Sequence, residues 1–227
     1  MKFQNAGYEP TGNPWEVAYL RFETPAEEIR KFSRRLKKLG AATWPRNASV
    51  LELFCGRGSG LRALRTLGFS RIAGADLSLS LIRNGDHTEA FVAADARQLP
   101  FRMGCKDIVI IQGGLHHLRE LPNDLENTLA EIKRILKPDG KLVIVEPWKT
   151  LFLSIVHAVC ANKLATRMSP KLKALASMID NEKPTYYQWL NRPGLILDLL
   201  AKYFDVLHRS VFMGKLYFIG KPRIDNR

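Results

Sequence analysis

Apolar and polar positions alternate along the middle of the chain in a pattern that predicts strands separated by helices. Apolar, β-branched runs predict five strands, at residues 49–54, 71–76, 89–95, 107–112 and 141–146. The segments 60–67, 79–84 and 125–136 have the spacing of helices, and Pro138-Asp139-Gly140 is a turn signal after the last of them. Strands that alternate with helices predict an α/β fold with a doubly wound parallel sheet.

The segment before this core is expected to contain one helix. Residues 1–15 are rich in glycine and proline, which predicts irregular structure. Thr24 offers a hydroxyl for an N-cap, Pro25 suits the first helical position, and acidic residues follow in the first turn. We expect this helix to run to Leu39 and to stop at Gly40.

The segment after the core changes character. Residues 150–200 are expected to be mainly helical, with an apolar helix over 150–166. Two further strands are predicted at 204–212 and 215–220, and only the short turn Met213-Gly214 separates them. Because a tight turn can join only antiparallel neighbours, we expect the sheet to be mixed at this edge.

The chain is strongly basic, with 35 lysines and arginines against 22 acidic residues and a formal net charge of +13. Such a surface favours an anionic partner, whether nucleic acid, lipid headgroups or a phosphorylated substrate. The densest cluster, Arg30–Lys38, has helical spacing, so the alternative is that it forms the solvated face of a helix.

Several simple features bear on location and on metal binding. The longest apolar run, Leu151–Ala161, is shorter than the roughly 18 residues that a membrane-spanning helix needs, and the N-terminus does not resemble a secretory signal. Cys55, Cys105 and Cys160 show no paired spacing. We therefore predict a cytoplasmic protein without disulfides and without a bound metal.

A glycine-rich segment follows the first strand and leads into a helix. Gly56, Gly58 and Gly60 would let the main chain turn sharply and approach a ligand where a side chain would collide. A dinucleotide oxidoreductase is the rival interpretation, but its fingerprint is G-x-G-x-x-G, and position 61 is not glycine. A P-loop is not indicated, because no Gly-Lys-Ser/Thr follows.

Residues 50–148 resemble the class I S-adenosylmethionine-dependent methyltransferase family, in its small-molecule and lipid-modifying branch. Besides the glycine loop, the matching pieces are Gly74–Ser78, Ala94–Ala96, Leu99–Phe101, Asp107–Val109, Leu115–Leu118 and Glu131–Leu142, in the family's order and spacing. The resemblance implies a Rossmann-like, mostly parallel seven-stranded sheet with an antiparallel C-terminal edge and a helical insertion. It also implies S-adenosyl-L-methionine as cofactor.

On this resemblance the chain is one methyltransferase domain. Its expected parts are an N-terminal helical extension (1–47), a cofactor-binding core (48–149), a helical substrate lid (150–200) and a C-terminal β-hairpin (201–227). Glu52 and the loop of Gly56, Gly58 and Gly60 are expected to hold the methionine part of the cofactor. The family usually has glycine where this chain has Phe54, so Phe54 must either point away from the cofactor or reshape its pocket.

Two acidic residues are expected to hold the nucleoside. Asp76, at the end of the second strand and followed by Leu77, would accept hydrogen bonds from the ribose, and Asp95 with Ala96 would hold the adenine. The alternatives are local: Asp76 would cap the next helix, and Asp95 would be a turn residue.

The catalytic candidates follow the fourth strand. Gln112 and Gly113 would lie near the sulfonium, and His116 or, preferably, His117 would act as a general base for a hydroxyl acceptor, because imidazole titrates near neutrality. The alternative is that one histidine only packs or orients the substrate. The aromatic segment 184–190 would close a lid over an apolar acceptor or, alternatively, pack against the sheet.

These observations predict methyl transfer to a small-molecule or lipid-like acceptor, with possible peripheral membrane contact through the basic surface. A tRNA or rRNA methyltransferase is the alternative that the charge suggests, although no RNA-binding module is recognisable. A non-catalytic, cofactor-binding partner subunit is the third interpretation. The oligomeric state is left open.

Overall fold

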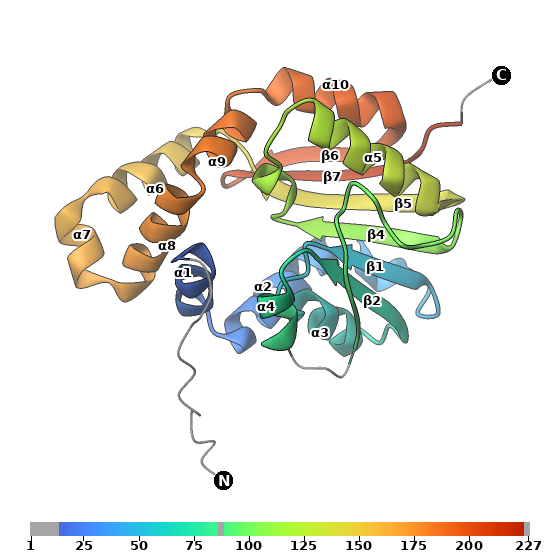
Figure 1. Ribbon diagram of the computed structural model, residues 1–227, viewed down its shortest axis with the longest axis horizontal. Helices are drawn as coiled ribbons and strands as arrows, with labels where there is room; N and C mark the ends of the chain where they lie inside the picture. Colours follow the sequence, from blue (N-terminus) through green and yellow to red (C-terminus); the bar gives the residue numbers. More distant parts are fainter. Residues whose placement is uncertain (1–13, 86–88, 225–227) are drawn as a thin grey trace, which may run out of the picture.

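A seven-stranded sheet forms the centre of the protein (Figure 1). The computed structural model describes residues 14–85 and 89–224. The strands are β1 (Ser49–Leu53), β2 (Arg71–Asp76), β3 (Ala90–Ala93), β4 (Lys106–Gln112), β5 (Leu136–Pro147), β6 (Phe204–Phe212) and β7 (Lys215–Pro222). Their order is β3-β2-β1-β4-β5-β7-β6.

The strand directions confirm the predicted fold class. β1 to β5 run parallel to one another, whereas β7 runs antiparallel to β5 and β6 runs antiparallel to β7. The hairpin turn is the predicted one, with Met213 and Gly214 at positive φ. The order reverses between β1 and β4, and in open α/β sheets the ligand crevice lies beyond the carboxyl ends of the strands at such a point.

Helices cover both faces of the sheet, because its central strands are apolar on both sides. One face packs against α2 (Pro25–Lys38), the short helix η1 (Ala41–Thr43) and α3 (Ser59–Thr66). The other packs against α5 (Asn123–Ile135), α9 (Lys183–Leu190) and α10 (Pro193–Tyr203). Alternate residues of β4 point toward opposite helix layers. Ile108 and Ile110 pack in the layer with α2 and α3, and Val109 and Ile111 pack in the layer with α5, α9 and α10.

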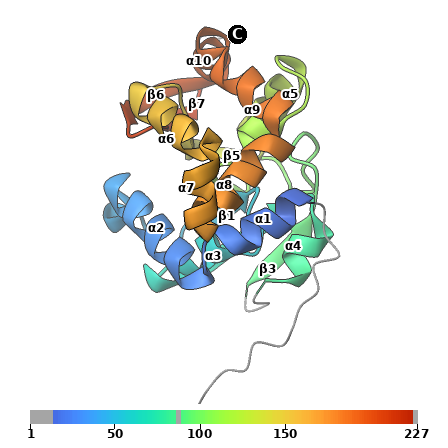
Figure 2. The ribbon, with the colours of Figure 1, turned by 90° about the vertical axis from the view of Figure 1, so that its left-hand side faces the viewer.

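The remaining helices gather at one end of the sheet, where α1 packs against α8 and α8 against α6 and α7 (Figures 1 and 2). Their bounds are α1 (Pro14–Phe22), α6 (Leu151–Ala161), α7 (Lys163–Met168) and α8 (Pro170–Asn181), while α4 (Leu79–Arg83) and η2 (Leu115–His117) follow β2 and β4. No helix within residues 14–85 and 89–224 is both long and apolar enough to cross a membrane.

The predicted element boundaries were correct in most places and wrong in three. Residues 1–15 were expected to be irregular, but α1 begins at Pro14, and residues 1–13 lie outside the described part. The expected turn at 138–140 lies within β5, which pairs with β4 from Leu136 onward through a shift of register. The expected helix 150–166 is divided, because the side chain of Asn162 caps the start of α7.

The start of α2 follows the sequence prediction in detail. The hydroxyl of Thr24 accepts a hydrogen bond from the amide of Glu27, and the carboxylate of Glu27 accepts one from the amide of Thr24. This reciprocal pair satisfies two amides that would otherwise lack partners. The helix ends before Gly40, whose φ of +84° suits glycine.

We expect α2 to be an integral part of the fold, since Leu36 is fully buried in the layer that α2 forms on the sheet. Leu36→Ala should lower the free energy of unfolding by about 2–5 kcal/mol, because it leaves a cavity in a packed core. Chemical denaturation would measure this loss, with the exposed neighbour Lys37→Ala as the control, for which a change within about 0.5 kcal/mol is expected. A negligible loss for Leu36→Ala would contradict this view of α2.

Candidate functional site

A large cavity opens beyond the carboxyl ends of β1, β2, β4 and β5, with a volume of about 1490 Å³. Residues of α1 and α2 line it on one side, and residues of α6, α8 and α9 on another. The predicted site residues in its wall are Glu52, Phe54, Gly56, Asp76, Leu77, Asp95, Ala96, Gln112, Gly113, His116 and His117. Gly58 and Gly60 lie outside the lining. The structure thus brings most of the candidates together, and their contacts with a cofactor stay a prediction.

Glu52 is a buried carboxylate with one oxygen left over. Gln112 donates a hydrogen bond to its Oε1 at 3.3 Å, whereas Glu52 Oε2 and Gln112 Oε1 have no hydrogen-bond partner among the described residues. Burial raises the pKa of Glu52 to about 8, although the bond from Gln112 opposes this. Gly60 makes room for this carboxylate, because a Cβ at Gly60 would lie 2.0 Å from Glu52 Oε1.

The glycine loop is shaped by packing as well as by backbone conformation. Gly56 and Gly58 have φ of +51° and +80°, which favours glycine. A Cβ at Gly58 would lie 2.5 Å from the ring of Phe91, and one at Gly56 would lie 3.2 Å from the hydroxyl of Tyr19 in α1. Of the three predicted glycines, therefore, Gly56 borders the cavity, while Gly58 and Gly60 allow neighbouring side chains to approach the loop.

Phe54 lines the cavity rather than pointing away from it. This residue has a φ of +55°, which is uncommon for a bulky side chain. Its ring packs against Gly114 so closely that a Cβ at Gly114 would lie 2.2 Å from Phe54 Cγ, and the side chain also lines the cavity.

Asp76 ends β2 and organises the loop beside it. Its Oδ2 accepts a hydrogen bond from the Gly56 amide at 2.7 Å, and its Oδ1 accepts one from the Ser78 amide at 2.8 Å. Burial raises the pKa of Asp76, and these two amides oppose that rise. The helix cap is Ser78, which accepts from the Leu81 amide, so the alternative that Asp76 caps α4 is wrong.

Asp95 is already engaged by an arginine. Its two oxygens accept hydrogen bonds from the guanidinium of Arg97, which also donates to Asp124 at 2.7 Å. This pairing lowers the pKa of Asp95. The Arg97 amide also donates to Asp95 at 2.9 Å, as expected of a turn residue, while Asp95 and the neighbouring Ala96 both line the cavity. Both interpretations of Asp95 therefore remain compatible with the geometry.

Glu146, at the end of β5, is fully buried and holds His116 in place. It accepts hydrogen bonds from the amides of Gly114 and Leu115 at 2.7 and 2.8 Å, and its Oε2 lies 2.7 Å from His116 Nδ1. Burial opposes ionisation, but His116 and the two amides outweigh it and lower the pKa of Glu146. Burial and the adjacent His117 lower the pKa of His116.

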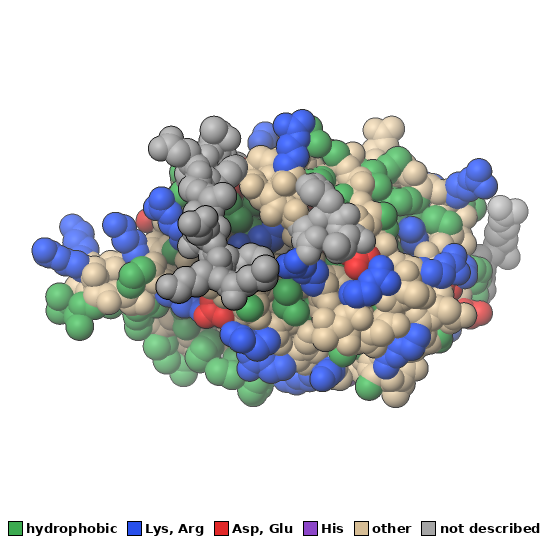
Figure 3. Space-filling view, turned by 90° about the horizontal axis from the view of Figure 1, so that it is seen from below, with side chains coloured by type: hydrophobic (Ala, Val, Ile, Leu, Met, Phe, Trp, Pro, Cys, Tyr) green, Lys and Arg blue, Asp and Glu red, His purple; other side chains and the backbone are tan. Residues whose placement is uncertain are grey.

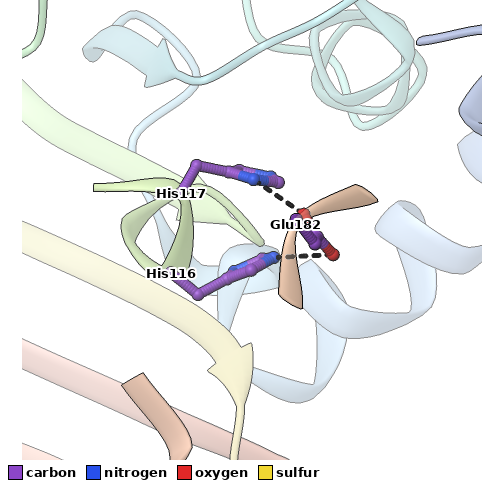
Figure 4. A group of neighbouring side chains, drawn as sticks. All are labelled: His116, His117 and Glu182. Atoms are coloured by element: carbon purple, nitrogen blue, oxygen red, sulfur yellow. Dashed lines mark ion pairs between the residues drawn. The ribbon is translucent and has the colours of Figure 1, made fainter. Parts of the chain in front are cut away.

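His117 faces a second carboxylate, from the junction of α8 and α9 (Figure 4). Its Nδ1 lies 2.9 Å from Glu182 Oε2, and Glu182 Oε1 lies 3.9 Å from His116 Nε2. Burial opposes ionisation of Glu182, but contacts with the two histidines outweigh it and lower its pKa. The ligand atoms of these three residues lie within 4.8 Å of one another, so they also offer a place for a metal ion, which the sequence did not predict.

The aromatic segment after Pro184 divides between the two expected roles. Tyr186 lines the cavity, and its hydroxyl lies 3.0 Å from His157 Nε2 of α6. Trp189 is buried in the core instead, where its indole donates to the carbonyl of Pro147 at 2.8 Å. The lid interpretation thus fits Tyr186, and the packing interpretation fits Trp189.

Several residues of the cavity wall were not predicted. Trp15 and Tyr19 come from α1, which sequence patterns missed, and Glu182 comes from a helix junction with no local motif. Arg35 and Lys215 also line the cavity. The sequence could have predicted that Arg35 faces the same way as Lys31. The two residues lie four positions apart, so they occupy the same face of α2, and both line the cavity.

Residues 51–144 match the family described as Methyltransferase domain. A demethylmenaquinone methyltransferase of Renibacterium salmoninarum is 32% identical over 187 residues, covering 74% of this chain and 76% of that protein. Another, of Corynebacterium urealyticum, is 38% identical over 98 residues, covering 43% of this chain but only 40% of that protein. The chain belongs to the class I S-adenosylmethionine-dependent methyltransferases.

The fold of this methyltransferase also matches solved structures. A crystal structure of a protein from Pyrococcus horikoshii matches with a TM-score of 0.67 and 19% sequence identity, covering 96% of this chain and 100% of that chain. This similarity confirms the Rossmann-like sheet. The family assignment also decides between the rival interpretations of the glycine loop, in favour of methyltransferase over dinucleotide oxidoreductase.

The unpaired atoms of this methyltransferase fit the cofactor that its family implies. Glu52 Oε2 and Gln112 Oε1 are both acceptors, so a group that satisfies them must be a donor. The α-ammonium of S-adenosylmethionine is such a donor, and its positive charge would compensate the buried Glu52 carboxylate. These residues therefore suit the methionine end of the cofactor.

We expect cofactor binding to depend on the ionisation of Glu52. Because its pKa is raised to about 8, Glu52 must lose a proton before it can pair with an ammonium group. S-adenosylhomocysteine carries the same ammonium, so its Kd should rise by up to about tenfold for each pH unit below 8. Calorimetry between pH 6 and 8 would measure this.

Two variants sharpen this measurement. Glu52→Gln should remove the pH dependence and weaken binding at pH 8, whereas Glu120→Gln, an exposed residue of the same cavity wall, should leave the pH dependence unchanged. A Kd for the parent protein that stays constant over this range would show that Glu52 does not carry the ammonium.

Proposed function

We propose that this methyltransferase transfers the methyl group of S-adenosylmethionine to a hydroxylated, quinone-like lipid acceptor. The observation that carries the proposal is that one cavity combines apolar and aromatic side chains, a histidine–carboxylate pair, and the buried acceptor oxygens of Glu52 and Gln112, which have no hydrogen-bond partner among the described residues. The names of the relatives from Renibacterium and Corynebacterium support the acceptor class.

The apolar end of the cavity suits a flat ring with a hydrocarbon substituent. It is lined by residues from α1, α2, α6, α8 and α9, namely Phe22, Phe32, Phe152, Leu153, Val156, Leu175, Met178, Ile179 and Tyr186. Apolar walls of this kind bind by excluding water, and a few polar groups fix the orientation of the ligand. The polar groups of the same cavity wall include His116, His117 and Glu182.

The cofactor, when bound, supplies an electrophilic methyl group. Glu52 and Gln112 are proposed to hold the methionine part of the cofactor, and Asp76 its ribose. Gly56 would allow the main chain to approach the cofactor. Asp95 and Ala96 are proposed to bind the adenine, with Leu77 and Gly113 along the wall between. Phe54 narrows the same wall, and Gly58 and Gly60 keep the loop in shape. Positioning of this kind can supply roughly 7–11 kcal/mol of the barrier.

His117 is proposed to accept a proton from the acceptor. The contact between its Nδ1 and Glu182 orients the ring and leaves Nε2 to accept the proton. Removing a proton from a ring hydroxyl makes the hydroxyl oxygen and the adjacent ring carbons electron-rich. His116 has a supporting role, because its Nδ1 is held by buried Glu146.

Contact with a membrane surface is part of this proposal. Large apolar side chains are exposed on α6 and at the turn between β6 and β7, where Phe152 and Met213 also line the cavity. Lysine and arginine side chains are spread over the face of the molecule in Figure 3, with few acidic side chains between them. Basic and apolar groups together suit an anionic lipid surface from which a lipid acceptor could enter.

A labelled-methyl assay tests the acceptor class. The purified protein would be incubated with radiolabelled S-adenosylmethionine and separated lipid, RNA, protein and small-molecule fractions of a cell extract. We expect label in the lipid fraction, and only when the quinones in it have been reduced to quinols. Label in RNA would favour the tRNA or rRNA alternative, and label in no fraction would favour a non-catalytic subunit.

We expect His117→Asn to lower kcat by about 10²–10⁴-fold, because it removes a general base, while the Kd for S-adenosylhomocysteine stays the same. His208→Asn, on the exposed strand β6, is the matched control and should retain full activity. Activity of the parent protein should also persist after treatment with a chelator. Loss of activity with a chelator, recovered with a divalent metal, would make His117 a metal ligand instead of a base.

A further inference from the structure

Two cations in the cavity wall have no ion-pair partner among the described residues. Arg35 of α2 and Lys215 at the start of β7 both line the cavity. Neither side chain donates a hydrogen bond to, or forms an ion pair with, any residue in the described ranges 14–85 and 89–224. Arg35 instead lies over the ring of Phe32, 5.8 Å from its centroid. By contrast, the nearby Lys31 forms an ion pair with Glu23.

The position of Lys215 places this pair on the acceptor side of the cavity. Lys215 lies opposite Pro147 in the antiparallel pairing of β5 and β7, one residue beyond Glu146. The proposed cofactor residues follow β1, β2 and β4, on the other side of β5 in the strand order. Arg35 approaches from the helix layer that covers β7, near Tyr217.

The charges around the two cations do not neutralise them. Burial lowers the pKa of Lys215 to about 8, and repulsion from Arg35 and Lys31 acts in the same direction. Glu146 and Glu182 attract Lys215, yet each is already committed to the histidines. Burial also lowers the pKa of Arg35, although Tyr217, Glu23, Glu146 and Glu28 oppose this. Of these acidic residues, Glu23 is paired with Lys31 and Glu28 with Arg57. Partly buried cations without an ion-pair partner reduce stability, so the presence of two of them at a cavity wall indicates a ligand that compensates them.

We propose that Arg35 and Lys215 bind an anionic oxygen of the acceptor. This inference rests on the proposed function, because it assigns the group on the acceptor that these residues recognise. The oxygen belongs either to an ionised ring hydroxyl or to a carboxylate on the ring. Two neighbouring cations in a partly desolvated wall would select the ionised form of either group over its neutral counterpart.

Ligand binding separates anionic from neutral ring compounds. The probes are 2,4-dinitro-1-naphthol, which is ionised at neutral pH, with its uncharged methyl ether, and 2-naphthoate with the uncharged 2-naphthamide. Their Kd values would be measured by calorimetry on the full chain saturated with S-adenosylhomocysteine. We expect at least one anion to bind about tenfold or more tightly than its neutral partner.

Variants connect this preference to the two cations. In the double variant Arg35→Met/Lys215→Met the anion-to-neutral ratio should fall to about one, whereas Lys215→Arg should keep most of it. The matched controls are Lys38→Met on α2 and Lys221→Met on β7, which remove the same charge from the same elements outside the cavity and should leave the ratio unchanged. Preference for the naphtholate assigns a ring hydroxyl, and preference for 2-naphthoate assigns a carboxylate.

Stability provides a second readout. Because each single variant to Met removes an unpaired cation, its Tm should equal or exceed that of the parent protein. A lower Tm would show that the cations serve the fold, which would overturn the proposal. It would also be overturned if neither anion were preferred, or if the double variant lost affinity for S-adenosylhomocysteine to the same extent, since the cations would then hold the carboxylate of the cofactor.

The anion-binding experiment and the methyl-transfer assay can reject their two proposals independently of each other. Absence of methyl transfer to quinols with an intact anion preference would reject the quinone-like acceptor and leave the anion site in place. Methyl transfer to quinols without any anion preference would do the reverse.

Discussion

A carboxylate with no exposure to solvent holds the centre of the site together. Glu146 can stay ionised in the interior only because the amides of Gly114 and Leu115 and the imidazole of His116 all point at it. Those three partners belong to the segment after β4, so one side chain of β5 determines how that segment turns. The direction of His116, and through it the presentation of His117 to the cavity, depends on this arrangement.

The sequence predicted the fold well, because the information that specifies it is local. Buried strands such as β4 are runs of apolar residues, and the capping residues of α2 can be identified within one turn. The antiparallel edge followed from the length of a single turn. What failed needed information from elsewhere in the chain: β5 begins early because β4 lies beside it, and α1 is recognised by its packing against α8 rather than by its own short sequence.

The same division applies to the candidate site. The position of Asp76 and of the histidine pair at the cavity could be predicted, because they lie at or just after the carboxyl ends of parallel strands, whereas Glu52 was expected there from the family resemblance. Glu182 could not, since it meets His117 only after α8 has folded back over the cavity. The basic cluster on α2 was predicted only in part. Some of its side chains face solvent, as expected of the solvated face of a helix, but Lys31 and Arg35 line the cavity.

The packing of Phe54 on Gly114 has a consequence for sequence variation in this family. Because the ring occupies the volume that a side chain at Gly114 would need, the two positions are not free to vary independently. Alanine or serine in place of Gly114 would therefore be expected only together with a smaller residue in place of Phe54. Covariation between these two positions would therefore identify homologues in which the packing between them has changed.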